Sequence, residues 1–185
     1  MAQVRNNIII QGLSGMIGKQ ILIRQDKAGR TIISARPRYN ANRILSETQK
    51  QHHDNFREAA AYARAARGEA VYISKAAGTP MNPYNVALAD WFHAPEILDM
   101  DLGDWSGQPG KVIRVKAIDD VLVSDVTVRI QGAGGALLEQ GEATQADGLW
   151  WEYTTKSTGS GSLTVFAAAQ DMPGNITEMS KVSSA

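Results

Sequence analysis

Short runs of alternating apolar and polar residues, separated by turn residues, fill the chain after Pro95 and constrain its fold most. In one run Val126, Val128 and Ile130 alternate with polar residues, so the three apolar side chains share one face of a strand. Several short strands at such regular spacing predict an antiparallel β-sandwich. The expected strands are 96–102, 111–117, 122–130, 136–143, 149–155, 162–169 and 175–182.

The first third of the chain carries hairpin signals. The run Ile8-Ile9-Ile10 and the runs 20–24 and 30–36 are rich in isoleucine. Glycine-rich residues 12–19 and the turn sequence Asp26-Lys27-Ala28-Gly29 separate them. This arrangement predicts paired antiparallel strands, which Pro37 ends.

A long helix is predicted next. Ser46 and Gln49 form a capping box, so the helix should run from Glu47 to about Arg67 and stop at Gly68. A second, short helix should begin at Asn82, with Pro83 in its first turn, and end near Trp91. The residues expected on the buried face of the long helix are Phe56, Ala59, Ala60, Ala63 and Ala66.

Two domains are therefore expected. Residues 1–94 would form a basic α+β domain of β-hairpin and helices, and residues 95–185 an acidic all-β sandwich. The total of 185 residues suits either two small domains or one large domain.

A net charge of zero conceals a strong asymmetry. Residues 1–78 carry thirteen Lys and Arg against five Asp and Glu, a net charge of +8, and residues 79–185 carry a net charge of −8. The basic part could contact nucleic acid, or it could contact the acidic part of another copy in a head-to-tail assembly. Two solvated surfaces of unlike charge are the third interpretation.

Several classes of protein lack support. The chain has no cysteine, which excludes disulfides and thiolate sites, and it has no apolar run of eighteen residues. Its first residues lack the long apolar core of a secretory signal peptide. We therefore expect synthesis in the cytosol, no membrane contact, and a final location in an assembled particle or machine, with an extracellular location as an alternative.

Candidate catalytic motifs fail on spacing. Residues 12–19 are rich in glycine, but Leu13 stands where a phosphate-binding loop needs glycine. His52 and His53 are adjacent on the predicted helix and point about 100° apart, which does not suit one shared metal. No nucleophile elbow accompanies these histidines or His93. We expect no enzymatic activity.

A series of motif residues runs through the predicted sandwich: Ala117, Asp119, Val121, Val123, Val126, Gly134-Gly135, Trp151, Tyr153-Thr154, Ala169, Asp171, Gly174 and Asn175. On these residues, 96–185 resembles bacterial immunoglobulin-like modules. The resemblance implies an immunoglobulin-like sandwich without the cysteine pair of antibody domains. It implies no particular ligand, since such modules occur in adhesins, phage virion proteins and enzyme appendages.

Residues 10–90 resemble an uncharacterised family of short bacterial proteins. The resemblance rests on a Gly-x-x-Gly-Lys hairpin start, a basic strand end, a glutamine-led helix and an Asn-rich segment. It implies no chemistry. The corresponding residues are 15–19, Arg36-Pro37, 49–56 and 82–85.

Polar residues follow two of the predicted strands. Asp119 and Asp120 follow one strand, and Asp171 and Asn175 follow another. In an immunoglobulin-like sandwich these two loops lie at the same end, where hard oxygen ligands could hold calcium. Asp and Asn also favour turns without any ion. Calcium is the only cofactor that the sequence suggests.

Candidate interface residues fall into three groups. Ile8, Ile9 and Ile10 could add as a strand to the sheet of another subunit. One of the two adjacent tryptophans should point outward; we expect Trp151 in the core and Trp150 exposed or half-buried. A basic series with Tyr39 among it could dock on an acidic neighbour or on phosphates: Arg24, Arg30, Arg36, Arg38 and Arg43.

Together these features favour a non-enzymatic structural subunit that assembles with copies of itself, in a virion, an injection machine or a filament. The expected partners are other copies, basic half to acidic half, with another structural protein as an alternative. A surface- or carbohydrate-binding adhesin module is the second hypothesis, and a nucleic-acid-binding protein the third.

Overall fold

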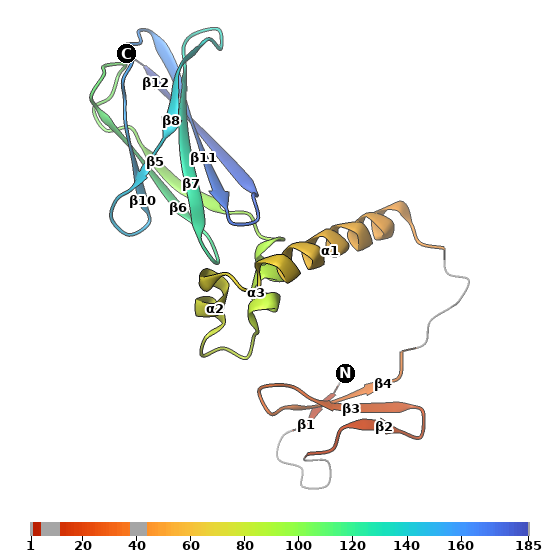
Figure 1. The fold of residues 1–185 in the computed structure, drawn as a ribbon. Helices are drawn as coiled ribbons and strands as arrows, with labels where there is room; N and C mark the ends of the chain where they lie inside the picture. The colour runs from red at the N-terminus through yellow and green to blue at the C-terminus, as the bar shows by residue number, and fades with distance from the viewer. Residues whose placement is uncertain (1, 5–11, 38–43, 185) are drawn as a thin grey trace. The chain divides into compact units, whose positions relative to one another are not determined.

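A computed structural model of the chain describes residues 2–4, 12–37 and 44–184. These residues form three four-stranded sheets and three helices (Figure 1). None of the described helices has the length and apolar character that crossing a membrane requires. Ile8, Ile9, Ile10, Arg38, Tyr39 and Arg43 lie outside the described residues.

The first sheet contains β1 (Ala2–Val4), β2 (Gly15–Ile17), β3 (Ile21–Gln25) and β4 (Thr31–Ala35), in the order β1-β4-β3-β2 with antiparallel pairing throughout. The predicted hairpin between β3 and β4 is confirmed. Its turn is held by Asp26, whose Oδ1 accepts hydrogen bonds from the backbone N–H groups of Ala28 and Arg30, both at 2.9 Å. β2 was not predicted, because its three residues lie within the glycine-rich segment.

The long helix forms as predicted. α1 (Glu47–Ala66) begins with a reciprocal capping box, in which the Ser46 backbone donates to Gln49 Oε1 and the Gln49 backbone donates to Ser46 Oγ. Ala59, Ala60, Ala63 and Ala66 are buried. Phe56 is 53% exposed, so its expected place on the buried face was wrong.

Two short helices follow. α2 (Ala70–Ala76) was missed by the sequence analysis, because its seven residues give too little periodicity to detect. α3 (Pro83–Asp90) was predicted correctly: Asn82 caps it by accepting a hydrogen bond from the Asn85 backbone at 2.8 Å, with Pro83 in the first turn.

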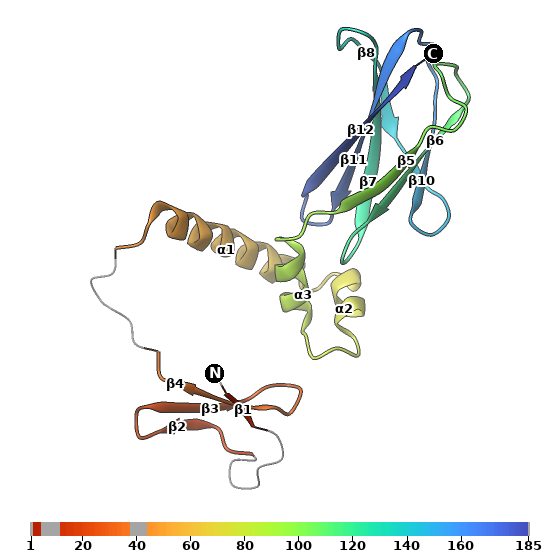
Figure 2. The same ribbon diagram turned by 180° about the vertical axis from the view of Figure 1, so that it is seen from behind.

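The rest of the chain is a β-sandwich (Figures 1 and 2). One sheet has the order β5-β6-β10-β9 and comprises β5 (Glu96–Asp101), β6 (Val112–Ile118), β10 (Trp150–Thr154) and β9 (Thr144–Gln145). The other has the order β12-β11-β7-β8 and comprises β12 (Ile176–Ser184), β11 (Ser162–Asp171), β7 (Val123–Gln131) and β8 (Leu137–Glu142).

Both sheets contribute to one apolar core. Val126, Val128 and Ile130 are buried on β7, as their alternation predicted, and Val165 and Ala167 are buried on the adjacent β11. The facing sheet supplies further buried side chains: Ile97, Met100, Ile113, Val115, Ala117, Trp151 and Tyr153.

A second apolar cluster connects the helices to the sandwich. Ala63, Tyr72 and Ala87 pack in it with Val121, which lies between β6 and β7, and Met172, which follows β11, packs against it. The chain accordingly divides into one compact unit of residues 1–55 with 78–80 and another of 56–77 with 81–185. This division differs from the predicted boundary after residue 94, because most of the helical segment packs on the sandwich.

Gly107 provides a test of the close packing between two loops of the sandwich. Its φ is +109°, and an added Cβ would lie 2.3 Å from the backbone oxygen of Gly159. Gly110 also has a positive φ, of +79°, but a Cβ there meets open space. We expect Gly110→Ala to lower the free energy of unfolding by about 1 kcal/mol, from backbone strain alone. Gly107→Ala should lower the free energy of unfolding by roughly 2 kcal/mol more, because the backbone at Gly159 must also move. Urea unfolding of the two variants measures the difference, and equal losses would contradict the close approach of Gly107 to Gly159.

Candidate functional site

Three aspartates from separate elements meet at one end of the sandwich. Asp119 follows β6, Asp171 is the last residue of β11, and Asp90 is the last residue of α3. One carboxylate oxygen from each lies within 4.8 Å of those from the other two. We call these three residues the aspartate cluster. Asp90 and Asp171 are each only 1% exposed, and Asp119 is half-buried.

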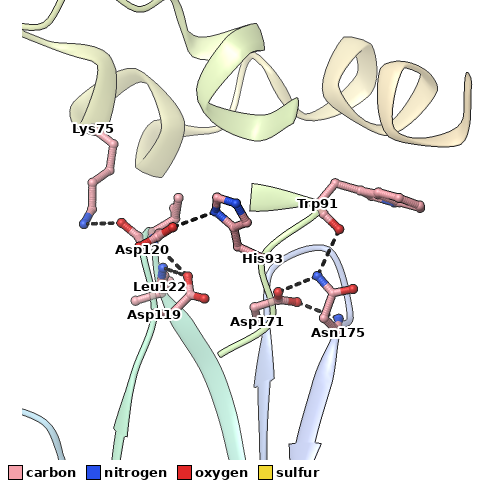
Figure 3. Close-up of polar contacts among 9 residues, drawn as sticks. Lys75, Trp91, His93, Asp119, Asp120, Leu122, Asp171 and Asn175 are labelled. Atoms are coloured by element: carbon pink, nitrogen blue, oxygen red, sulfur yellow. Dashed lines mark hydrogen bonds and ion pairs between the residues drawn. The ribbon is translucent and has the colours of Figure 1, made fainter. Parts of the chain in front are cut away.

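Asp119 is positioned by the turn that it opens. Its Oδ2 atom accepts hydrogen bonds from the backbone N–H groups of Val121, at 2.7 Å, and Leu122, at 2.9 Å (Figure 3). This side-chain turn is common for Asp after a strand. The other oxygen, Oδ1, is buried and has no hydrogen-bond partner.

Asp171 is positioned by the turn between β11 and β12. Its Oδ1 atom accepts from the backbone N–H groups of Gly174, at 2.8 Å, and Asn175, at 2.6 Å. The Asn175 amide donates to Oδ2 at 2.7 Å and also to the backbone oxygen of Trp91 at 3.3 Å (Figure 3). Asn175 therefore orients Asp171 and ties this turn to the residues that follow α3.

Asp90 is held from the helical side. Its Oδ2 atom accepts a hydrogen bond from the Tyr72 hydroxyl at 2.6 Å, and the Tyr72 and Tyr62 hydroxyls lie 2.6 Å apart. The Oδ1 atom is buried without a hydrogen-bond partner. Burial raises the pKa of the Tyr72 hydroxyl, so Tyr72 remains a donor to Asp90 at neutral pH.

Burial also raises the pKa of Asp90, from 3.8 to about 6. The Tyr72 hydrogen bond opposes this rise, while the negative charges of Asp119 and Asp171 add to it, as does the hydrogen bond that protonated Asp90 makes to Asp119. Among the ion pairs of the described residues, none joins Lys or Arg to a member of the cluster. The cluster therefore concentrates negative charge at a buried position.

The sequence analysis identified part of this site. Asp119 and Asp171 meet at one end of the sandwich, as predicted. Asp120 points elsewhere: its Oδ2 lies 2.8 Å from His93 Nδ1, and its backbone oxygen accepts from Lys75 Nζ at 2.9 Å (Figure 3). Asn175 contacts the cluster as a hydrogen-bond donor to Asp171.

Asp90 was missed. A signal for it exists in the sequence, because a negative side chain in the last turn of a helix opposes the helix dipole. Such a residue is locally unfavourable, which marks Asp90 as a candidate for a functional site. The tertiary contact with Asp119 could not be foreseen, since it depends on how α3 packs against the sandwich.

The predicted interface residues on the first sheet are exposed. Arg24 lies on β3, Arg30 lies in the turn before β4 and pairs with Asp26, and Arg36 follows β4. All three side chains face solvent. Their proposed role in docking remains a prediction.

Trp150 and Trp151 point to opposite faces, as predicted. Trp151 is 8% exposed and belongs to the core, whereas Trp150 is half-buried. The Arg114 guanidinium lies 4.9 Å from the centre of the Trp150 ring, and Lys116 Nζ lies 5.7 Å from it. These cations already contact the ring on which a sugar would have to stack.

The raised pKa of Asp90 predicts that the free energy of unfolding depends on pH. A chelator in the buffer keeps metal ions from binding the carboxylates during the measurement. The folded state holds the Asp90 proton up to about pH 6, and the unfolded chain loses it near pH 4. The folded state therefore binds more protons in this window, so the Asp90 contribution to the free energy of unfolding falls as pH rises, by about 3 kcal/mol in total.

Asp90→Asn should remove this contribution, because the amide does not titrate. Urea unfolding of both proteins at pH 4, 5, 6 and 7 with EDTA measures the difference, with the exposed Asp147→Asn as the matched control. Equal pH slopes for the original protein and Asp90→Asn would contradict the prediction. Asp119, Asp171 and Tyr72 face Asp90 and are unchanged in the comparison.

Comparisons with known proteins give the chain no family. No family model and no curated protein matches it. Among solved structures, CopC from Methylosinus trichosporium is similar over 50% of this chain and 92% of its own, at 19% identity and a TM-score of 0.39. A conjugative transposon lipoprotein from Bacteroides eggerthii is similar over 48% of this chain and 93% of its own, at 12% identity and a TM-score of 0.28. Likenesses this distant carry no argument about function.

Proposed function

We propose that the protein is a non-enzymatic structural subunit that associates with other copies of itself through the first sheet. The observation that carries the proposal is a pair of exposed isoleucines on one face of this sheet, beside the buried Ile23. Ile17 is 54% exposed and Ile21 is 42% exposed.

The strand register places the isoleucines on one face. Ile17 pairs with Ile21, Ile21 pairs with Ala35, and Ile23 pairs with Ile33. Directly paired residues in antiparallel strands project to the same side, so these five residues form one face. We call it the isoleucine face.

The first sheet has little core of its own. Among its described side chains only Ile23 and Thr31 are buried. A small sheet needs a second layer against its apolar face for stability. Completing the burial of a half-exposed isoleucine contributes about 1 kcal/mol, so a partner on the isoleucine face would stabilise the sheet as well as join two molecules.

Charge favours another copy as that partner. Residues 1–78 carry a net charge of +8 and residues 79–185 a net charge of −8. The exposed Arg24, Arg30 and Arg36 make the first sheet basic. Arg24 alternates with Ile21 and Ile23 and projects from the opposite face, so its attraction to an acidic sandwich would act at long range. A contact between unlike surfaces is heterologous and continues into rings or filaments, as a virion, injection-machine or filament component requires.

We also infer that the sandwich is an immunoglobulin-like module carried by an α+β N-terminal part. Antiparallel pairing in both of its sheets and the buried Trp151 between them support this assignment. In the assembly this module would add to the contact or project from it.

Adjacent residues of β2 offer a matched test. Ile17 and Met16 are exposed to similar extents, 54% and 51%, but lie on opposite faces of the sheet. We expect the original protein to exceed its monomer mass of 20.0 kDa in sedimentation velocity, increasingly with concentration and less at high salt. Ile17→Glu should require at least about tenfold higher concentration for the same association, because a charge would be buried at the contact. Met16→Glu should behave as the original protein.

Two results would overturn the proposal. A monomer at every concentration and salt would exclude self-association. Equal effects of Ile17→Glu and Met16→Glu would show that the isoleucine face is not the contact. Circular dichroism of each variant verifies that the sheets remain folded.

A further inference from the structure

We propose that Asp90, Asp119 and Asp171 bind one calcium ion, which joins α3 to the two loops at the end of the sandwich. This inference is independent of the self-association proposed above. It rests on the spacing of the oxygens, on one buried oxygen each of Asp90 and Asp119 that accepts no hydrogen bond, and on the charge around them.

The spacing suits a single large ion. Calcium binds oxygen ligands at about 2.3–2.6 Å, so two oxygens of one coordination shell lie at most about 4.6–5.2 Å apart. The three aspartate oxygens lie within 4.8 Å of one another. This spacing is compatible with one ion bound by all three aspartates.

Two oxygens at the site are buried and unpartnered. Asp90 is 1% exposed, and when it is ionised its Oδ1 atom and Asp119 Oδ1, both buried, accept no hydrogen bond; only protonated Asp90 can bond to Asp119. The second oxygen of each is used, by the Tyr72 hydroxyl for Asp90 and by two backbone N–H groups for Asp119. Asp90 and Asp119 are thus each oriented through one oxygen and leave the other available, whereas both oxygens of Asp171 already accept hydrogen bonds. A buried oxygen without a partner costs free energy that a bound cation would recover.

The charge of the cluster favours binding of a cation. Three carboxylates from three elements converge, and among the described residues no Lys or Arg pairs with them. The nearby Lys75 and His93 are engaged with Asp120: Lys75 binds its backbone oxygen, and His93 lies against its carboxylate. A divalent ion would neutralise most of the charge that the cluster carries when ionised.

Ligand chemistry selects calcium among common ions. The cluster offers oxygen alone, without the histidine or cysteine ligands that zinc and copper favour. Magnesium binds at about 2.0–2.1 Å in strict octahedral geometry, and three fixed carboxylates from three elements suit the more flexible calcium shell better. Water would complete the coordination.

The first test is a direct titration with calcium. Full-length protein freed of metal is titrated to about 10 mM calcium by calorimetry at pH 7.5, which covers the weak affinities of extracellular calcium modules. Terbium provides a second readout, because the Tyr72 side chain contacts Asp90 and can sensitise its luminescence. We expect one ion per chain, bound in preference to magnesium.

Neighbouring residues give the matched variants. Asp119→Asn keeps an oxygen that can accept the backbone hydrogen bonds but removes the charge, so it should weaken calcium binding at least tenfold. Asp120→Asn removes an adjacent carboxylate outside the cluster and should leave the affinity unchanged within about twofold. Equal affinities for Asp119→Asn and the original protein would overturn the proposal, as would the absence of both heat and terbium luminescence.

A third variant separates lost binding from lost folding. Asp90→Asn relieves repulsion among the carboxylates, so its midpoint of thermal unfolding in EDTA should be higher than that of the original protein. Calcium should raise the midpoint of the original protein by several degrees and leave that of Asp90→Asn unchanged. A calcium-dependent rise of equal size in both proteins would place the ion elsewhere and overturn the assignment. A lower midpoint for Asp90→Asn in EDTA would contradict the repulsion on which the assignment rests.

Discussion

The burial of Asp90 beside two other carboxylates is the constraint on which the larger unit of the protein depends. The residue ends α3, receives the Tyr72 hydroxyl from α2 and faces Asp119 and Asp171 of the sandwich. The apolar cluster around Tyr72 and Val121 brings these groups together despite their charge. Apolar burial favours this packing, while concentrated negative charge opposes it. Whatever neutralises the cluster therefore controls how firmly the helices are attached.

The first sheet differs from the aspartate cluster. It exposes apolar side chains, whereas the cluster buries charged ones. Ile17 and Ile21 of its isoleucine face are exposed, although Ile23 on the same face is buried, while the sandwich contains its own core between two sheets. The two proposals consequently concern different parts of the chain. One assigns an intermolecular contact to the first sheet, and the other assigns an ion to the junction of helices and sandwich.

The sequence predicted those features that depend on local pattern. The alternation of Val126, Val128 and Ile130 identified β7 and its buried face, and Ser46 with Gln49 located the start of α1. The proximity of Asp119 and Asp171 could be predicted, because each follows or ends a strand at the same end of the expected sandwich. The contribution of Asp90, the short α2 and the exposure of Phe56 depend on how separate elements pack, which periodicity does not encode. The compact units of the structure also divide the chain at a different place from the predicted boundary.

The register of the last strand determines how the sandwich would bear mechanical load. β12 pairs with β11 over nine residues, from Ile176 opposite Gln170 to Ser184 opposite Ser162. Its first residue therefore lies beside the aspartate cluster and its last about 30 Å away, near the other end of the sandwich. Tension applied between the helical segment and the end of β12 would pull that strand along its own length. All the hydrogen bonds of the pair would then resist together in shear, whereas a force across the strand would break them one after another.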